Sequence, residues 1–539
     1  MSSSKRWNET RDIFNDWTVE TAFRKVFEDE ASYEGISTWW CSSIMKRDSI
    51  DSNLWLIELD KKLTRDLSSE NDASLRFIPR GWLRNFLTDL ILHLYRYCAI
   101  KPSNFLRKDI ETLFICNEYN LSKATNNIVD KNYAGVPTSG RNEGRIGFAI
   151  VPTEICIKPV LFFKYRQKWQ KWQNLKNYDV YFTSSRSSIR TIIDVYTWSI
   201  KSYWAIRKIC NSNKLDLMTI SEIDCSVVLN PLLEDSFSNQ IPRNIIYGLA
   251  MVQIADDVLG DGSVVTYGEM ISETLFFYAL LRFKLPLVKI IVVQHSLIFE
   301  NKMQMIMHPD SFIPRSRNRF EAAQMPDMYL LQGEQAKRIV ARFMPEDRIK
   351  IIGSLKSGTN LVRNSSLDCN KSYINIVVAL SLGDEFYVLD CIRELLTISN
   401  YKWTVCFHPA VSLKVKNQFI HSIASNHTLV EIYSGKTTDK FDTADVVISG
   451  YSAVGIEALH HGIDTIRVVN VGLPPTIDDD LRVPCVSSAS ELSILLSRKC
   501  GGEKLIIDKN SIVHDFFYLQ DNREDERFWE VVNRVNGMR

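Results

Sequence analysis

The chain has 539 residues, a length at which about two to four folding units are expected. Apolar residues make up 45% and charged residues 24%, which is the composition of a globular protein able to bury a large core. Its 65 Lys and Arg residues nearly balance its 64 Asp and Glu residues, and the net charge of +1 argues against a dedicated nucleic-acid binder, which usually carries a strong basic excess.

Cysteine usage and the N-terminal sequence predict a cytoplasmic protein. The 11 cysteines are scattered and form no Cys-x-x-Cys pair, so small buried thiols in a reducing compartment are favoured over a disulfide or zinc framework. The first residues, Met1–Asn8, lack the apolar stretch of a secretory signal. The longest candidate membrane span, Phe86–Ile100, contains Asp89 and Arg96 and is therefore interpreted as an amphipathic helix.

Residues 1–130 are predicted to be mainly helical. Apolar residues recur at three- and four-residue spacing over Asn15–Glu28 and Leu83–Ala99. Between these two segments lies an aromatic stretch around Trp39 and Trp40. The sequence leaves two roles open for these tryptophans, which could pack in the core or stack on sugar rings.

Two segments with unusual composition follow. Lys131–Arg145 is rich in glycine and polar residues and is predicted to be a loop. Leu161–Trp172 is basic with interleaved aromatic residues. It is interpreted either as a solvated helix with one packed face or as a helix lying on an anionic membrane surface.

From about residue 178, strands alternate with helices, a pattern that predicts parallel sheets with crossover helices. The predicted strands are 179–183, 264–267, 289–295, 328–333 and 348–353 in a first half, and 374–380, 403–407, 430–433, 445–449 and 465–469 in a second. The halves are joined near residues 345–370, and the C-terminal 515–536 is predicted to be helical. Ligands of such sheets bind beyond the carboxyl ends of the strands, so a crevice between the halves is the expected site.

The most informative stretch is Ala444–Gly462, where a buried strand ends at Ser449, turns through Gly450 and gives way to a helix near Ser452. The N–H groups at the start of a helix favour an anion such as phosphate, and the two serine hydroxyls add donors. Glu457, on the same helix, could accept hydrogen bonds from ribose hydroxyls. In the alternative interpretation, Ser452 only caps the helix.

A second candidate is His408-Pro409, which directly follows the predicted strand 403–407. Its strand end would face the same crevice as Ser449. A cationic or hydrogen-bonding imidazole beside a helix start would clamp a phosphate without a metal. Histidines also occur at strand ends for packing reasons alone.

Other motifs are not supported. Ser434–Thr437 resembles the end of a phosphate-binding P-loop, but Val430 stands where the first glycine is required. Asp478–Asp480 follows two prolines in a loop and is interpreted as a solvated acidic turn. No metal site is indicated by the sequence.

With these motifs, the chain resembles bacterial surface-carbohydrate glycosyltransferases of the two-Rossmann, GT-B architecture. It is most similar to the sialyl- and Kdo-transferase-like enzymes that use CMP-activated acidic sugars. In those enzymes a His-Pro motif and a downstream serine motif hold the CMP phosphate, and the matches here are His408-Pro409 and Ser449–Ser452. Residues 326–354 resemble the interdomain region of such proteins, and Ile36–Trp40 resembles a subset of surface carbohydrate biosynthesis proteins. The resemblance covers roughly residues 260–470.

The resemblance implies an α/β fold with two Rossmann-like domains that face a central cleft, and a helical N-terminal elaboration. Residues 1–345 would form the acceptor-binding domain with its helical additions, and residues 346–514 the nucleotide-sugar-binding domain. Residues 515–539 would form a helix that packs back on the N-terminal domain.

The resemblance also implies a catalytic base, because in inverting members a carboxylate of the N-terminal half deprotonates the acceptor hydroxyl. Glu269 is preferred over Glu273 and Asp261, since it follows a predicted strand end; its alternative role is to cap the next helix. His295, in a Gln-His pair that the family often carries, would contact the acceptor or the sugar carboxylate, or would be a satisfied core histidine.

Further donor contacts are expected from three polar residues. Lys356 would contact the phosphate or the sugar carboxylate, although surface solvation is the commoner role of a lysine. Asp384 and Glu385 follow the first strand of the second half and would contact the donor base or sugar.

The implied function is transfer of an acidic ulosonic or nonulosonic sugar from a CMP-activated donor to a bacterial surface glycan, such as capsule, O-antigen or lipopolysaccharide. The donor is a substrate, and no cofactor or metal is expected. The expected partners are the nucleotide sugar and a glycan or lipid-linked glycan, with peripheral contact at the inner membrane and no nucleic acid. Two alternatives stay open: the same fold acting on a UDP-sugar, GDP-sugar or CDP-polyol, and a noncatalytic scaffold in a polysaccharide assembly complex.

Overall fold

The computed structural model describes residues 16–42, 44–45, 87, 90–91, 110–117, 121–124, 127–130, 133, 136, 145–151, 179–183, 186–212, 219–220, 223–267, 272–298, 307–355, 373–381, 384–408, 411–423, 430–450, 452, 454–469, 483–506, 508–517 and 523–537.

Seven parallel strands form a first sheet, in the order β13-β12-β11-β10-β3-β6-β7. In chain order they are β3 (Ile110–Asn117), β6 (Ile146–Val151), β7 (Asp179–Phe182), β10 (Leu259–Thr266), β11 (Lys289–Val293), β12 (Met328–Leu331) and β13 (Ile349–Ile351). The chain starts in the middle at β3, runs outward to β7, and returns to the other side of β3 at β10. This is the doubly wound order, and its direction reverses between β3 and β10.

Both faces of this sheet are covered, which is why its strands are nearly continuous apolar runs. In β11, Ile290 and Val292 pack into one core cluster, and Ile291 and Val293 into another. The first cluster includes side chains of the helices α7 (Ile189–Ser212), α9 (Ser226–Asp235), α10 (Ile241–Val258) and α11 (Ser272–Lys284). The second is covered by α18 (Glu524–Val535).

The prediction that residues 1–130 are mainly helical is wrong for 110–117, which form the central strand β3. The α/β pattern therefore begins near residue 110 and not near 178. The apolar run in β3 is short, and periodicity alone cannot separate such a run from a buried helix segment. Further upstream, residues 16–20 and α2 (Ala22–Glu30) are helical as predicted, whereas most of Leu83–Ala99 lies outside the described residues.

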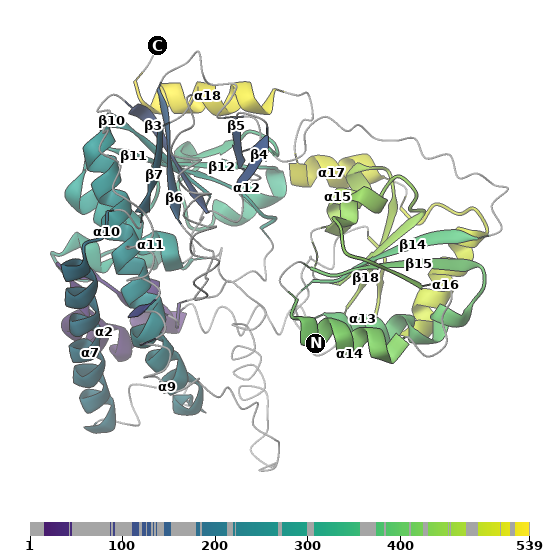
Figure 1. Ribbon diagram of the computed structural model, residues 1–539, viewed down its shortest axis with the longest axis horizontal. Helices are drawn as coiled ribbons and strands as arrows, with labels where there is room; N and C mark the ends of the chain where they lie inside the picture. The colour runs from purple at the N-terminus through teal and green to yellow at the C-terminus, as the bar shows by residue number, and fades with distance from the viewer. Residues whose placement is uncertain are drawn as a thin grey trace.

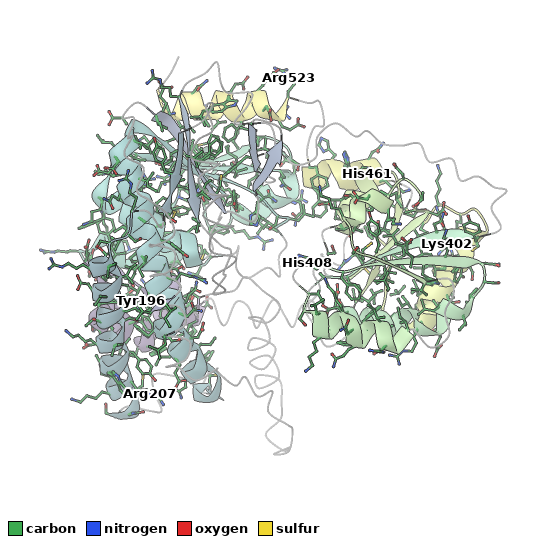
Figure 2. All side chains as sticks on the ribbon, viewed as in Figure 1. Tyr196, Arg207, Lys402, His408, His461 and Arg523 are labelled. Atoms are coloured by element: carbon green, nitrogen blue, oxygen red, sulfur yellow. The ribbon has the colours of Figure 1, made fainter. Side chains whose placement is uncertain are left out.

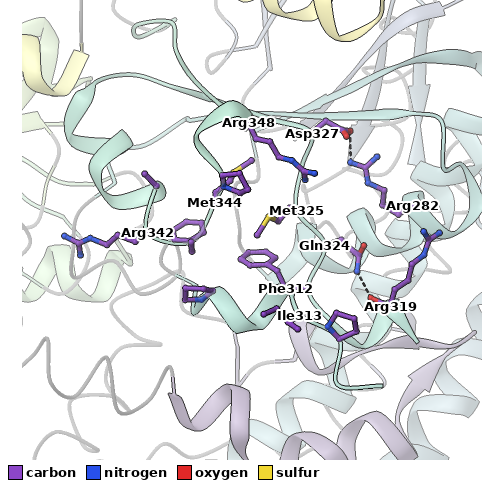
Figure 3. A pocket seen from close by; sticks show the side chains of 16 residues that line it. Arg282, Phe312, Ile313, Arg319, Gln324, Met325, Asp327, Arg342, Met344 and Arg348 are labelled. Carbon is purple, nitrogen blue, oxygen red and sulfur yellow. Dashed lines mark hydrogen bonds and ion pairs between the residues drawn. The ribbon is translucent and has the colours of Figure 1, made fainter. Parts of the chain in front are cut away.

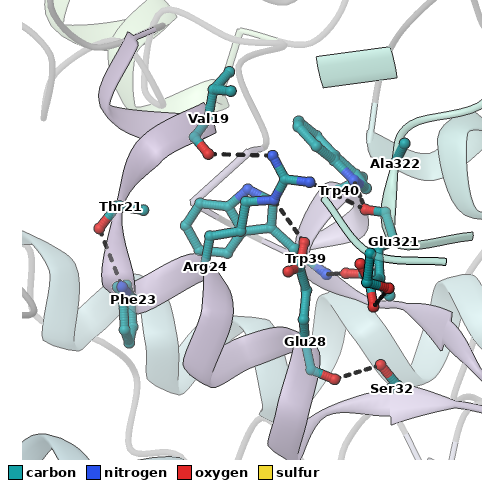
Figure 4. A network of polar contacts seen from close by, with 12 residues as sticks. Val19, Thr21, Phe23, Arg24, Glu28, Ser32, Trp39, Trp40, Glu321 and Ala322 are labelled. Carbon is teal, nitrogen blue, oxygen red and sulfur yellow. Dashed lines mark hydrogen bonds and ion pairs between the residues drawn. The ribbon is translucent and has the colours of Figure 1, made fainter. Parts of the chain in front are cut away.

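The aromatic N-terminal segment packs in the core. Trp39 is fully buried, with its ring 5.3 Å from that of Phe27. Trp40 donates from Nε1 to the carbonyl of Glu321 at 2.8 Å, and the guanidinium of Arg24 lies 4.8 Å from its ring centroid (Figure 4). Both tryptophans therefore fix the N-terminal helices to the first domain, and neither ring is exposed to stack on a sugar.

Six parallel strands form the second sheet, in the order β16-β15-β14-β17-β18-β19. They are β14 (Ile374–Ala379), β15 (Tyr401–Cys406), β16 (Val430–Tyr433), β17 (Val446–Ser449), β18 (Asp464–Val468) and β19 (Cys485–Val486). The helices α13 (Glu385–Ile392), α14 (Leu413–Ile423) and α16 (Ala489–Cys500) share one core cluster with one face of the sheet. The short helix α15 (Val454–His460) contributes to the cluster of the opposite face, together with β14 and β17. This sheet is also doubly wound, and its reversal falls between β14 and β17.

The two strand orders confirm the predicted α/β fold with two Rossmann-like domains, the architecture called GT-B. Figure 1 shows the two domains as separate lobes, with the C-terminal helix α18 lying on the first of them. Trp529 of α18 donates from Nε1 to the carbonyl of Val136 at 3.0 Å, and the ring of Phe528 stacks on Phe114 at 6.0 Å.

The helix α17 (Lys509–Phe517) connects the two domains. Its apolar side chains pack with Ile456 and Leu459 of α15 and with Leu297, which follows β11 of the first domain. Arg338 forms a bidentate ion pair with Asp515 at 3.0 and 2.7 Å. A single helix therefore contacts both domains.

A buried ion-pair cluster attaches α17 to the second sheet. Asp464, at the start of β18, has a fully buried side chain that accepts from Lys499 of α16 and pairs with Lys509 of α17 at 2.8 Å. Lys509 also donates to the carbonyl of Gly462 at 2.6 Å. Burial alone would raise the pKa of Asp464, but the two lysines lower it overall.

In the part of the chain that the structure describes, no helix has the length and apolarity needed to span a bilayer.

Candidate functional site

The reversal point of the second sheet brings polar groups from two neighbouring strands together. Asp384 follows β14 and is fully buried; its carboxylate accepts from the backbone N–H of Ser381 at 2.7 Å and from the hydroxyl of that serine at 2.6 Å. Gly450 directly follows β17. A Cβ at Gly450 would lie 2.5 Å from Oδ2 of Asp384 and closer still to the hydroxyl of Tyr387. Only a glycine lets these groups approach the backbone so closely.

The two serines of the predicted anion turn have different surroundings. Ser449 is 1% exposed, and its hydroxyl oxygen lies 2.6 Å from where a Cβ of Gly455 would stand, so it packs against the first turn of α15. Ser452 is partly exposed, and its Oγ accepts from the N–H of Val454 at 3.2 Å. Ser452 therefore has the capping contact of the alternative interpretation. Glu457 lies one turn into α15 and is half-buried.

His408 follows β15 and lies on the side of the second lobe nearest to the first in Figure 2. It does not adjoin the serine turn directly, because β14 runs between β15 and β17. Burial and the nearby cation of Lys416 lower the pKa of His408 below its usual value of 6.5. The imidazole is therefore neutral at pH 7, and it can offer a phosphate a hydrogen bond but no fixed positive charge.

On the first domain, aromatic and amide side chains occupy the corresponding reversal point. The hydroxyl of Tyr133 contacts the carbonyls of Ile115 in β3 and Val265 in β10, at 3.0 and 3.2 Å. The ring of Tyr267, which follows β10, lies 5.1 Å from Tyr133 and 5.7 Å from His295.

The two residues of the Gln-His pair have different surroundings. Gln294 is buried and accepts from the N–H of Gln332 at 2.8 Å, while its carbonyl accepts from the side chain of Gln332 at 3.1 Å. This joins the ends of β11 and β12. His295 is partly exposed beside them, and Leu297, two residues later, packs against α15 of the second domain. His295 thus lies where the two domains meet.

Three predicted site residues, Glu269, Lys356 and Pro409, lie outside the described residues, as do Asp478–Asp480 and the basic segment Leu161–Trp172. Of the two other carboxylates that were considered as bases, Asp261 is exposed within β10, and Glu273 lies in the first turn of α11. Among the residues that can be described, no group of three His, Cys, Asp or Glu side chains is arranged to hold a metal ion.

Two residues near this edge of the second sheet belong to no sequence motif and were not predicted, Tyr387 and Lys416. Tyr387 lies one helical turn after Asp384 and reaches Gly450. Lys416, on α14, has its ammonium 5.9 Å from the ring centroid of Phe407 and affects the pKa of His408. Each lies on the helix that follows a predicted site residue: Tyr387 on α13, after Asp384, and Lys416 on α14, after His408. That position is the one feature of the sequence that could have identified them.

Replacing Gly450 with alanine is expected to open this packed edge. The added Cβ must displace Asp384 or Tyr387, and overpacking of this kind costs about 1–3 kcal/mol. We expect a lower free energy of unfolding, measured by urea denaturation. Gly260→Ala is the matched control, because a Cβ there meets nothing within 4 Å. If both variants changed the free energy of unfolding equally, the close packing at Gly450 would not be the cause.

The second domain is expected to lose stability in mild acid. Burial lowers the pKa of His408, His460 and His461 below 6.5 in the folded chain. Below pH 6.5 the unfolded chain therefore binds more protons than the folded one, so the stabilisation present above that pH is lost as pH falls through the folded values. The melting temperature should drop between pH 7 and 5.5, and it should drop less steeply in His460→Gln. If the melting temperatures of the parent and the variant fell in parallel with pH, His460 would not contribute to the pH dependence.

Comparisons with known proteins give likeness in structure only. No family model matches the chain, and no curated protein does. Similar solved structures include the Anabaena protein HepE in complex with UDP and glucose, at 10% identity and a TM-score of 0.43, covering 79% of this chain and 99% of that one. They also include the lipopolysaccharide outer core galactosyltransferase WaaB, at 11% identity and a TM-score of 0.39, covering 78% and 99%.

A third similar structure is the UDP-GlcNAc 2-epimerase from Neisseria meningitidis bound to UDP-GlcNAc, at 9% identity and a TM-score of 0.40, covering 78% of this chain and 99% of that one. At these low identities and TM-scores, the likeness assigns neither an activity nor a donor to this chain.

Proposed function

We propose that the chain is a glycosyltransferase that takes its sugar from a nucleotide donor bound at the reversal point of the second sheet. The observation that carries this is the close approach of Asp384 and Tyr387 to Gly450, at the position where doubly wound sheets bind nucleotides. Asp384 and Tyr387 fill the space beside Gly450, so the glycine lets the ends of β14 and β17 pack closely together. Next to this packed edge, the partly exposed Ser452 and Glu457 supply a hydroxyl and a carboxylate, which are groups that suit a sugar or ribose.

We propose a nucleoside diphosphate sugar as the donor, in place of a CMP-sugar. His408 and Gly450 follow strands that lie on either side of β14. Neighbouring strands are about 4.8 Å apart, so these two positions are separated by about 10 Å at the backbone. A diphosphate linkage suits this separation better than one phosphate. The lowered pKa of His408 makes the ligand-free imidazole a neutral hydrogen-bonding group and not a preformed cation.

In this proposal, residues 346–514 hold the donor, residues 1–345 hold the acceptor, and residues 515–539 tie the two together. The acceptor oxygen attacks the anomeric carbon, the bond from that carbon to the phosphate oxygen breaks, and the diphosphate leaves with the electron pair. Glu269 takes the acceptor proton, and His295 orients the acceptor hydroxyl at the boundary between the domains. We assign His408, Ser452 and Lys356 to binding of the leaving phosphates, and Glu457 to binding of the ribose.

A peripheral position at a membrane surface, with a lipid-linked glycan as the acceptor, belongs to the same proposal. It depends on the basic aromatic segment Leu161–Trp172.

A thermal-shift panel with UDP, GDP, CDP and CMP tests the donor class, since a bound ligand raises the melting temperature. We expect a nucleoside diphosphate to give the largest shift and Gly450→Ala to reduce it. The preferred nucleotide's sugars are then incubated with the chain, with and without a glycan acceptor. Release of nucleotide only with acceptor supports transfer. A larger shift with CMP would restore the CMP donor, and epimerised sugar without transfer would reject the transferase.

A further inference from the structure

A cavity lies on the first domain, at the edge of the sheet opposite the carboxyl ends of its strands. It has a volume of 760 Å³, within the usual range for small-molecule sites of about 300–1,000 Å³. Two of its lining residues, Asp327 and Arg348, immediately precede β12 and β13. It therefore opens at the amino ends of these strands, whereas His295 and Gln332 follow the carboxyl ends.

The cavity carries an excess of positive charge. Its one carboxylate, Asp327, is already engaged, because it pairs with Arg282 at 2.6 Å and accepts from the N–H of Ile290 at 2.7 Å. Arg319 and Arg348 have no carboxylate within ion-pair distance among the described residues. Arg348 contacts the carbonyl of Pro326 at 3.5 Å, and Arg319 lies 4.7 Å from the ring centroid of Phe320.

The rest of the lining is apolar. The rings of Phe312 and Phe343 stack with their centroids 6.3 Å apart, and the lining includes Met325 and Met344. Methionine side chains adapt to ligands of irregular shape. At the rim, Ile313 is 58% exposed. Covering this apolar side chain with a ligand would be favourable, because it removes apolar surface from water.

Charged and apolar groups occupy different parts of this cavity. Figure 3 shows Arg282 and Arg319 at the right and Arg348 at the top, with Phe312 and Met325 in the middle and Met344 to their left. Arg342, which also lines the cavity, is directed away from its centre in the same view.

We propose that this cavity binds an amphipathic phosphate monoester, with the phosphate against Arg319 and Arg348 and the apolar body over Phe312 and Met325. These two guanidinium groups, which have no carboxylate partner within the described part of the chain, match the roughly two negative charges of a phosphate monoester. Each guanidinium can bind two phosphate oxygens at once. The apolar lining binds a hydrocarbon or ring that a free phosphate lacks. This site is separate from the donor site and does not depend on the proposed transfer reaction.

Isothermal titration calorimetry with octyl phosphate, below its micelle concentration, tests the site on the full chain. Inorganic phosphate and octanol serve as the two half-ligands. We expect octyl phosphate to bind at least about tenfold more tightly than either, because each contributes only one of the two contacts. Binding of inorganic phosphate as tight as that of octyl phosphate would overturn the proposal.

Variants locate the binding. Arg319→Gln and Arg348→Gln should each weaken octyl phosphate binding about tenfold, the usual effect of losing a charged hydrogen bond. Arg342→Gln is the matched control and should leave it unchanged. Arg282 is kept, because its pair with Asp327 is structural. Unfolding curves like that of the parent show that each variant folds. Equal affinity in all three variants, or binding only to vesicles of anionic lipid, would overturn the proposal.

Discussion

Replacing Asp464 with asparagine is expected to reduce the free energy of unfolding by about 3–5 kcal/mol. The side chain of Asp464 is fully buried between Lys499, which is 5% exposed, and Lys509, which is 19% exposed. Removing one partner of a buried ion pair leaves uncompensated charge in a poorly solvated place, and that is far more costly than losing a surface pair. Urea unfolding at pH 7 measures the change.

Glu503→Gln is the matched control, because Glu503 also pairs with a basic residue of α16, Arg498, but both are exposed. No measurable change in the unfolding midpoint is expected there. The pKa of Asp464 is lowered below its usual 3.8, so its stabilisation is present above that pH and is lost as pH falls through the folded value. The difference in the free energy of unfolding between the parent and Asp464→Asn should therefore become smaller in strong acid. A difference that stayed constant down to pH 2 would show that the ion pairs are not its cause.

This cluster also bears on the connection between the domains. Lys509 begins α17, the helix that packs on α15 and forms the Arg338–Asp515 pair with the first domain. Loss of the Asp464 charge should therefore loosen α17 as well as the second sheet. Hydrogen exchange of the α17 amides would report this directly.

The strands of both sheets could be predicted largely because parallel strands are buried on both faces. Each such strand is a short apolar run between turns, as in Ile374–Ala379 and Val446–Ser449. The strand β3 was not predicted for the same reason. Its short apolar run follows a long segment with helical periodicity, and periodicity alone does not separate a buried strand from a buried helix. The strand order could not be predicted, because the pairing of β14 with both β15 and β17 depends on tertiary contacts.

The sequence could predict where the candidate site residues fall in the fold, but not their surroundings. Strand ends and a glycine turn directed attention to His408 and Gly450, and both follow strands at the carboxyl edge of the second sheet. Three features could not be predicted from the sequence: Ser449 faces α15, β14 separates the two positions, and burial lowers the pKa of His408. These follow from packing between segments that are distant in the sequence.

Replacing His408 with alanine is expected to lower the transfer rate by about 100-fold, the usual effect of removing one donor to charge that develops in the transition state. His421→Ala is the matched control, because His421 lies on the adjacent helix α14 but is exposed. It should leave the rate unchanged. Initial rates with saturating acceptor measure both variants, and unfolding curves exclude a general loss of structure.

His408→Gln separates a donor-binding role from a structural one. The free imidazole has a pKa below 6.5, and a bound phosphate would raise it, so nucleotide binding should take up a proton in the window between the two values. Nucleotide affinity should therefore increase as pH falls through this window. Glutamine keeps a hydrogen-bond donor but does not titrate, so this pH dependence should vanish in the variant. An unchanged pH dependence would exclude His408 from contact with the phosphate, because a residue that only packs against β15 would not change its protonation with ligand.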